Sequence, residues 1–142
     1  MSQLIVILFL ALSTSAYAQD SCPDFSGIYH CKNGEAASVA IRIYQVIAND
    51  IHNVYIFDQS QNMDHFKLNN QWRENDRTKE LSKAKCLTGN SMEILFKGTF
   101  RGGTYLMSQD FVLDDKGNLN TTYNLNVNGI PQPSRTQTCL IQ

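Results

Sequence analysis

The chain has 142 residues and a formal net charge of −1, because 12 lysine and arginine residues stand against 13 aspartate and glutamate residues. Proteins that bind nucleic acid or anionic membranes through electrostatics carry basic patches or a strong positive charge. The balanced composition therefore gives no reason to expect either partner, and the length suits a single domain.

The chain opens with an apolar run at residues 4–12, which the small-x-small pattern Ala16-Tyr17-Ala18 follows. This order is typical of a secretory signal peptide, although no lysine or arginine precedes the apolar run. The run is shorter than the roughly 20 residues that a membrane-spanning helix needs. We therefore predict a signal peptide at residues 1–18, with a buried N-terminal helix as the alternative. Residues 19–142 would then form one secreted or periplasmic domain without a membrane span.

The predicted mature part contains four cysteines, Cys22, Cys31, Cys86 and Cys139. An even number of cysteines in an exported chain indicates disulfides, two of them here. We expect no metal site, because no two of the cysteines have the Cys-x-x-Cys spacing. Three pairings are compatible with the sequence. The most local one joins Cys22 to Cys31 and Cys86 to Cys139, whereas a Cys22–Cys139 bridge would join the first strand to the last and would suit a closed barrel.

Short alternating or aromatic-rich segments, separated by turn residues, make up the mature part. Alternation of apolar and polar side chains, which indicates a half-buried antiparallel strand, is clearest at residues 119–127. Asn33-Gly34 and Asn128-Gly129 indicate hairpins. The charged segment 73–85 fits either a short helix or a strand that runs into Cys86, and we favour the strand. In chain order the predicted strands are residues 25–31, 39–47, 54–57, 65–68, 73–85, 92–100, 105–113, 119–127 and 134–142.

Strands at regular spacing, joined by short turns, predict an antiparallel meander. Neighbouring strands joined in this way favour a barrel in which each strand pairs with the next along the chain. We therefore expect an all-β fold, namely a disulfide-stapled, antiparallel up-and-down barrel of about 8–10 strands. A β-sandwich is the alternative, because the same pattern of short strands also fits two packed sheets.

The segment Phe25-Ser26-Gly27-Ile28-Tyr29 resembles the Gly-x-Trp opening strand of the lipocalin-like (calycin) barrels, with Tyr29 in place of tryptophan. In that family a glycine and an aromatic ring close the floor of the barrel, and an arginine on the final strand packs over the ring. Arg135, on the predicted last strand, is the matching candidate here. The resemblance implies a lipocalin-like, cup-shaped barrel that holds an apolar small molecule.

A second resemblance lies in the overlapping segment Tyr29-His30-Cys31-Lys32-Asn33-Gly34, which is similar to the Tyr-x-Cys-x-x-Gly opening of secreted bacterial inhibitors of c-type lysozyme. Those inhibitors also insert a Ser-Gly-x-x-Tyr loop into the enzyme's cleft. The Ser-Gly pair of this chain, Ser26-Gly27, lies upstream of the similar segment. The resemblance implies a small secreted module that binds a protein partner.

Residues that could carry catalysis or hold a metal do not form a recognisable set. The histidines His30, His52 and His65 fall on three predicted strands and lack the spacing of metal ligands. The chain also lacks a Gly-x-Ser-x-Gly nucleophile elbow and a glycine-rich phosphate loop. We therefore predict a protein that is not an enzyme and that needs no cofactor.

The inward faces of the predicted strands are rich in aromatic residues, which would either fill a barrel or line a cavity inside it. For the cavity we take Tyr29, Tyr105, Met107, Tyr123 and Arg135 as candidate ligand-binding residues, because hydroxyl groups orient a ligand among apolar walls. The function that we predict is a secreted β-barrel that binds a hydrophobic small molecule in its interior. The alternatives are a protein-interaction module of the lysozyme-inhibitor kind and a structural protein without a ligand.

Overall fold

The computed structural model describes residues 22–32, 38–75, 78–87 and 89–142, so the predicted signal peptide and the Asn33-Gly34 hairpin lie outside the described residues. The described residues form strands and turns without a helix, which confirms the predicted all-β class. No helix among them has the length and apolar character needed to cross a membrane. The strands are β1 (Gly27–Cys31), β2 (Val39–Ala48), β3 (Ile51–Phe57), β4 (Met63–Lys67), β5 (Arg73–Glu74), β6 (Leu81–Cys86), β7 (Ser91–Phe100), β8 (Gly103–Leu113), β9 (Leu119–Val127), β10 (Ile130–Pro131) and β11 (Arg135–Ile141).

All strands belong to one antiparallel sheet with the order β4-β3-β2-β1-β11-β9-β8-β7-β6-β5, and β10 pairs with β9 beside this path. Consecutive strands are neighbours nearly throughout, and β11 returns to pair with β1, where Tyr29 lies opposite Ile141. The sheet curls on itself into a half-barrel. The predicted antiparallel barrel with up-and-down connections is therefore confirmed in this partly closed form.

Closure of the sheet stops between β4 and β5, the two ends of the strand path. At this place the backbone N–H of Asn70 donates to the carbonyl oxygen of Ala84 at 2.8 Å. The rings of Phe66 and Phe96 also meet edge to face, with centroids 5.7 Å apart. The two ends of the sheet therefore approach each other without pairing, and we call the gap between β4 and β5–β6 the slit.

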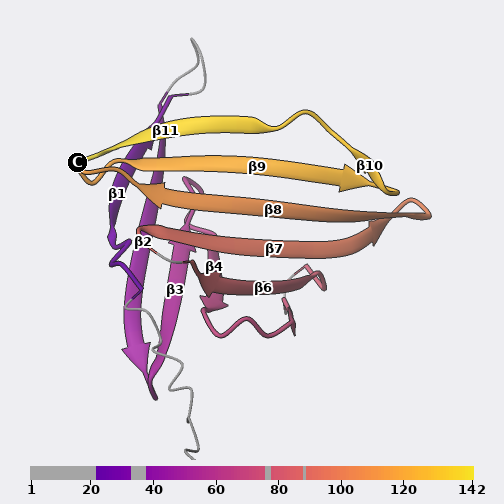
Figure 1. The fold of residues 1–142 in the computed structure, drawn as a ribbon, viewed down its shortest axis with the longest axis horizontal. Helices are drawn as coiled ribbons and strands as arrows, with labels where there is room; N and C mark the ends of the chain where they lie inside the picture. Colours follow the sequence, from indigo (N-terminus) through magenta and orange to yellow (C-terminus); the bar gives the residue numbers. More distant parts are fainter. Residues whose placement is uncertain (1–21, 33–37, 76–77, 88) are drawn as a thin grey trace, which may run out of the picture.

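Strands β1 to β3 run across the direction of β6 to β9 and β11, as Figure 1 shows. The ends of β7, β8 and β9 that carry their far turns, together with β10, extend beyond β1–β3 in this view. We call this extended part, residues 95–107 and 123–137, the wing. Because β1–β3 do not reach over the wing, its concave face is left uncovered where the core ends.

One buried cluster draws its side chains from both sets of strands and holds the sheet in its curled form. Burial follows the pleat, so that Met92 and Ile94 on β7 and Phe111 on β8 point to the same side as Leu119 on β9. Burying an aliphatic or aromatic side chain of this size stabilises a fold by about 1.5–3 kcal/mol. The cluster comprises Phe25, Tyr29, Cys31, Ile43, Val54, Phe66, Leu68, Ala84, Met92, Ile94, Phe111, Leu119 and Cys139.

The four cysteines form two disulfides, Cys22–Cys86 and Cys31–Cys139, which confirms the predicted number of bridges. The pairing is neither of the two arrangements described above but the third. Cys31 lies directly opposite Cys139 in the β1–β11 register, with their Cα atoms 4.0 Å apart. Pairing of the first strand with the last therefore decides which cysteines meet, and this pairing is not readable from local sequence.

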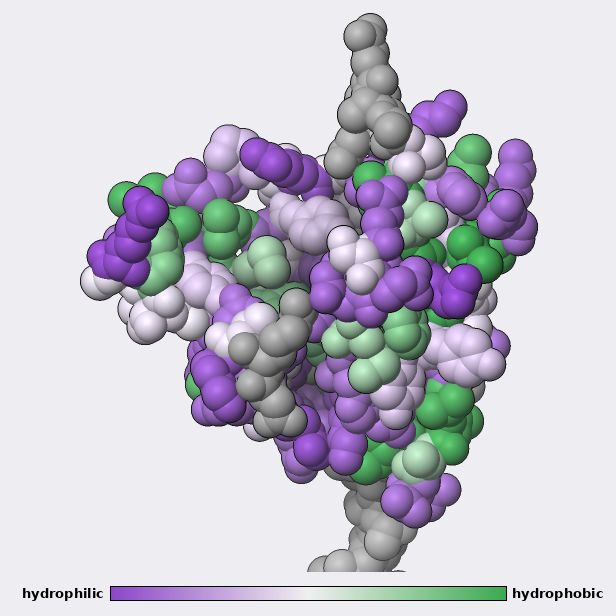
Figure 2. Space-filling model, turned by 180° about the vertical axis from the view of Figure 1, so that it is seen from behind, coloured by the Kyte–Doolittle hydropathy of each residue, from purple (hydrophilic) through white to green (hydrophobic). Residues whose placement is uncertain are grey.

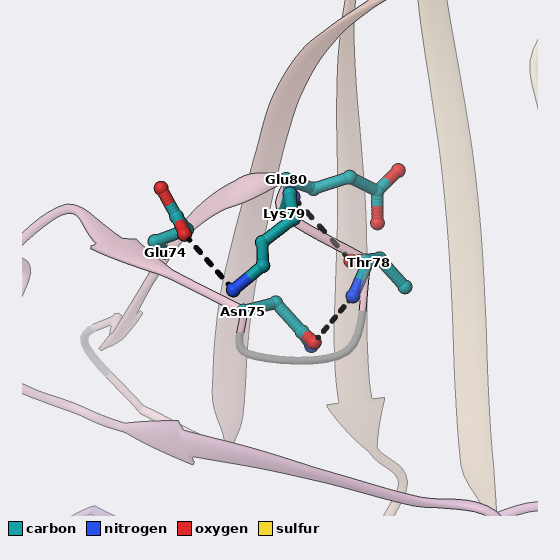
Figure 3. Close-up of polar contacts among 5 residues, drawn as sticks. All are labelled: Glu74, Asn75, Thr78, Lys79 and Glu80. Carbon is teal, nitrogen blue, oxygen red and sulfur yellow. Dashed lines mark hydrogen bonds and ion pairs between the residues drawn. The ribbon is translucent and has the colours of Figure 1, made fainter.

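The charged segment 73–85 is extended rather than helical, as favoured from the sequence, but a turn divides it into β5 and β6. In this turn the backbone N–H of Thr78 donates to Asn75 Oδ1, and that of Glu80 donates to Thr78 Oγ1 (Figure 3). Lys79 has a φ of 59° and places its Nζ 3.4 Å from Glu74 Oε1. Local hydrogen bonds of this kind compete with a regular strand, so the segment folds into a hairpin.

The face behind that of Figure 1 is predominantly hydrophilic, and its hydrophobic side chains occur in separate groups (Figure 2). Large apolar side chains that remain exposed include Tyr44 and Ile47 near the end of β2, at 60% and 66%. Single exposed apolar residues are normal on a soluble surface. The hollows between the strands are therefore more informative about function than this face.

Candidate functional site

A hollow on the concave face of the wing collects most of the predicted ligand-binding residues. It has a volume of about 630 Å³, which lies within the range of small-molecule sites. Its walls come from β8, β9, β11 and the loop that joins β10 to β11. We call it the wing pocket, and it is lined by Met107, Tyr123, Leu125, Gln132, Pro133, Arg135, Thr136 and Gln137.

Strand register explains why these residues meet. Met107 lies opposite Leu125, and Tyr123 lies opposite both Gln109 on β8 and Arg135 on β11. Side chains two or four residues apart on a strand share a face, so Met107 is on the same side as the buried Phe111. The wing pocket is therefore a continuation of the core face beyond the point where β1–β3 cover it.

The lining of the wing pocket mixes apolar and polar side chains, and it includes the hydroxyl group of Tyr123. Gln109 Nε2 donates to Tyr123 Oη at 2.7 Å, which holds the hydroxyl group in place. Burial raises the pKa of Tyr123, and its contact with Thr121 offsets this rise in part. The hydroxyl is therefore protonated at neutral pH and can donate to an acceptor on a ligand.

Arg135 supplies the positive charge at the rim of the wing pocket. Its side chain is exposed, and within the described parts of the chain no carboxylate forms an ion pair with it. A guanidinium group keeps its charge at all physiological pH values and binds carboxylates through two parallel N–H bonds. The pocket thus combines the apolar side chains of Met107, Leu125 and Pro133 with the Tyr123 hydroxyl and with the Arg135 guanidinium, which no carboxylate of the described residues pairs with.

The loop between β10 and β11 forms the outer wall of the wing pocket. The backbone N–H of Gln132 donates to the carbonyl oxygen of Leu125 at 2.7 Å, which holds this loop against β9. Leu125 belongs to the clearest alternating stretch of the sequence and faces the same way as Tyr123, so it was within reach of sequence reasoning. The contributions of Gln132 and Pro133 could not be predicted from the sequence, because no periodicity indicates which way a loop residue points.

Tyr29, one of the predicted ligand-binding residues, belongs to the core and not to the wing pocket. It is 1% exposed, and its Oη donates to the carbonyl oxygen of Phe25 at 3.0 Å. Its ring covers Gly27, where an added Cβ would lie 3.1 Å from the ring. The assignment of Tyr29 to a cavity is corrected accordingly, because every polar and apolar surface of this side chain is already used inside the protein.

Arg135 does not stand over Tyr29, the position that the calycin resemblance implies. The residue opposite Tyr29 on β11 is Ile141, whereas Arg135 lies opposite Tyr123 on β9. Six residues of an extended strand separate Ile141 from Arg135, a distance of about 20 Å. Arg135 therefore contributes to the wing pocket instead of closing the floor of a barrel.

Tyr105 lies elsewhere on the wing, in a shallower hollow of about 660 Å³ that Lys97, Leu106 and Asn128 also line. It sits opposite Gly98 across β7 and β8, and its hydroxyl donates to Glu80. Burial and this hydrogen bond to a carboxylate raise the pKa of Tyr105 to about 12. The structure thus brings Met107, Tyr123 and Arg135 together and separates Tyr29 and Tyr105 from them.

The three histidines are held by amide side chains on separate strands. His30 contacts Gln142, His52 contacts Gln45, and His65 contacts Asn53, at 3.0–3.1 Å. Among the residues that the structure describes, no three or more His, Cys, Asp or Glu side chains gather closely enough to hold a metal ion. The described chain therefore offers no arrangement on which to build a metal centre.

Comparison of the chain with known protein families, with curated proteins and with solved structures gives no match. The fold and the pocket chemistry therefore have to carry the functional argument.

Proposed function

We propose that this protein is exported and binds an amphipathic small molecule, with an apolar body and an acidic group, in the wing pocket. The observation that carries the proposal is the meeting of Met107, Leu125, Tyr123 and Arg135 around one hollow of about 630 Å³. The apolar walls would take the body of the ligand, and the hydroxyl and guanidinium groups would bind its carboxylate. Such a ligand is a specific form of the hydrophobic small molecule predicted from the sequence.

Export is proposed on two grounds that are independent of the pocket. The N-terminal 18 residues have the pattern of a cleavable signal peptide. Both disulfides also belong to compartments that are oxidising, such as the cell exterior and the periplasm. Purification of the mature protein from the medium or the periplasm, with an N-terminus that follows Ala18, would support export.

The direct test is a titration of the mature protein with a fluorescent long-chain fatty acid that an unlabelled fatty acid can displace. We expect Arg135→Gln to weaken binding of the acid by about tenfold, or about 1.4 kcal/mol, and to leave binding of the matching fatty alcohol nearly unchanged. Leu125→Asn should weaken both compounds. Arg42→Gln, at an exposed arginine on β2 outside the wing, is the matched control. Absence of displaceable binding, or equal effects of the two arginine variants, would refute the proposal.

A second candidate is the interaction with a secreted protein. The observation that favours it is the pair of exposed apolar side chains Tyr44 and Val46, which lie two residues apart on β2 and therefore share one face. A mixture of the protein with a c-type lysozyme tests the inhibitor form of this idea. Dose-dependent loss of lysozyme activity would support it, provided that Tyr44→Ser weakens the effect, and unchanged activity across several lysozymes would count against it.

A further inference from the structure

The slit between β4 and β5–β6 contains a cavity that the wing pocket does not use. Its volume is about 520 Å³, and it is bordered by both ends of the strand path. The hydrogen bond from Asn70 to Ala84 bridges the two sides of the slit. Three separate elements therefore contribute side chains to one hollow, where a continuous sheet would have been sealed by backbone pairing.

Cationic side chains border this cavity on three strands, namely Lys67 on β4, Arg73 on β5 and Lys83 on β6. The acidic side chain among the described residues that line it is Glu74, whose Oε1 lies 3.4 Å from Lys79 Nζ. In the described parts of the chain, no carboxylate forms an ion pair with any of the three cations. Among the described residues that line the cavity, positive charge therefore exceeds negative charge.

The ammonium group of Lys83 lies near an aromatic ring. Its Nζ lies 5.1 Å from the centroid of the Trp72 ring, and Lys97 Nζ lies 4.2 Å from the same centroid. A cation–π contact orients an ammonium group without cancelling its charge. Lys83 is therefore held beside the cavity as a charged donor.

His65 adds a hydrogen-bond acceptor to the same lining. Its Nε2 lies 3.0 Å from Asn53 Oδ1, and Asn53 uses its own Nδ2 to donate to the carbonyl oxygen of Ile51. Asn53 Oδ1 is thus an acceptor, so Nε2 carries the proton and Nδ1 keeps a lone pair in the neutral ring. The ring stacks on Tyr55 with centroids 4.5 Å apart, which fixes its orientation.

Burial and the charges around His65 favour its neutral form. Burial is the largest cause that lowers the pKa of His65, and Lys67 and Arg73 lower it further. Lys83 on β6 adds positive charge to the same lining, while Glu74 on β5 is engaged with Lys79. An anion bound beside these cations would offset their repulsion of a protonated His65, and the pKa of His65 would rise again.

We propose that the slit is a second binding site, which takes the phosphate group of a small phosphorylated molecule. A compact dianion matches the excess of positive charge from three directions, and Arg73 can bind two phosphate oxygens at once. The cavity is larger than a free phosphate ion requires, so an ester with a small organic group fits it better than the inorganic ion does. The neutral Nδ1 of His65 would accept a hydrogen bond from a hydroxyl group on the organic part of the ligand.

Isothermal titration calorimetry with glucose 6-phosphate, inorganic phosphate and glucose tests this site. We expect saturable binding of the sugar phosphate, weaker binding of inorganic phosphate and none of glucose. Arg73→Gln and Lys67→Gln should each weaken binding by about tenfold. Lys116→Gln, at an exposed lysine in the turn before β9, should have no effect, and Arg135→Gln should also have none because it belongs to the wing pocket.

An NMR titration of the His65 ring gives an independent readout. With glucose 6-phosphate bound, the pKa of His65 should rise, and Arg73→Gln should abolish this rise. Inorganic phosphate that binds as tightly as the sugar phosphate would assign the site to the free ion. Absence of saturation by either compound up to about 10 mM at low salt, or equal weakening by Lys116→Gln, would overturn the proposal.

Discussion

Two tyrosines cover two glycines in this protein, one pair in the closed part of the sheet and one on the wing. Tyr29 lies over Gly27 within β1, whereas Tyr105 lies over Gly98 across β7 and β8. Aromatic rings beside a strand glycine fill the space that the missing side chain leaves. Their surroundings differ, because the hydroxyl of Tyr29 is bound to a backbone carbonyl in the core and that of Tyr105 to the carboxylate of Glu80 at the rim of a hollow.

This contrast extends to the rest of the two regions. The closed part contains the Cys31–Cys139 bridge and the buried cluster, and the polar groups of its tyrosine are satisfied internally. The wing keeps apolar and charged side chains partly exposed around its pocket. Stability is therefore concentrated in the closed part, and groups that remain available to a ligand are concentrated on the wing.

Removal of the Cys31–Cys139 bridge should cause the largest loss of stability, because this bridge lies in the closed part of the sheet. The double variant C31A/C139A is expected to lower the free energy of unfolding by about 2–5 kcal/mol, because the bridge closes a long loop and both cysteines are fully buried. Guanidinium denaturation of the variant measures this loss. C22A/C86A is the matched control and should cost less, since Cys22 and Cys86 are only half-buried. A larger loss in the control would contradict the assignment of stability to the β1–β11 seam.

The tyrosine hydroxyls provide a sharper comparison with smaller expected effects. Tyr29→Phe should lower the free energy of unfolding by about 1–3 kcal/mol, because the buried carbonyl of Phe25 loses its donor. Tyr105→Phe should cost less than about 1 kcal/mol, because Glu80 can turn to water. Urea denaturation of both variants measures these two losses of unfolding free energy. Equal losses would show that the two tyrosine hydroxyls contribute equally to stability.

The glycines beneath these rings test how far each region can adjust. An added Cβ would lie 3.1 Å from the Tyr29 ring at position 27 and 2.8 Å from Tyr105 Oη at position 98. Although the second contact is tighter, Gly27→Ala should cost more, about 1–2 kcal/mol, because the buried ring has no room to move. Thermal unfolding of Gly27→Ala and Gly98→Ala gives the two values. The reverse order would mean that the wing is as tightly packed as the core.

A substitution of Asp110, on the outer surface of β7 and β8, should have the smallest effect on stability. Asp110 lies opposite Glu93, and burial followed by the charge of Glu93 raises the pKa of Asp110, while Lys85 lowers it. A raised carboxyl pKa means that the contribution of this group to stability is complete below its unfolded pKa and is lost as the pH rises through its folded pKa. Asp110→Asn should therefore stabilise the protein at pH 7, by less than about 1 kcal/mol, and should lose this advantage near pH 3.

Comparison of the melting temperatures of Asp110→Asn and the parent protein at these two pH values tests this sign. Glu93→Gln serves as a control because it relieves the same repulsion but also removes the ion pair with Lys85 at 3.1 Å. Its net gain at pH 7 should therefore be smaller. Stabilisation of Asp110→Asn that persisted unchanged at low pH would exclude the electrostatic explanation.

Local pattern was sufficient to predict most of the strands. The alternation at 119–127 and 105–113 predicted β9 and β8 closely, and it placed Met107 and Tyr123 on one face. Since neighbouring strands of a meander are also neighbours in space, these two residues could be grouped before their register was known. The same logic failed for Tyr29, because alternation tells which face a side chain occupies but not whether another layer covers that face.

The features that the sequence did not predict depend on contacts between residues far apart in the chain. The disulfide pairing depends on β11 returning to β1, and the slit depends on where the sheet stops closing, neither of which local sequence encodes. Lys67, Arg73 and Lys83 are spread over three strands, so nothing in their spacing indicates that they border one cavity. The turn between β5 and β6 likewise depends on hydrogen bonds that Asn75 Oδ1 and Thr78 Oγ1 accept from backbone N–H groups, and a charge pattern does not reveal these bonds.

The bridge between Cys31 and Cys139 links residues that are 108 positions apart. A protease that cut any exposed loop between them would leave both fragments attached to each other, and the cut protein would keep its mass apart from one added water. The cut would become visible on a gel only after reduction. Such a chain can therefore lose the continuity of its backbone at one loop while its strands remain tied together.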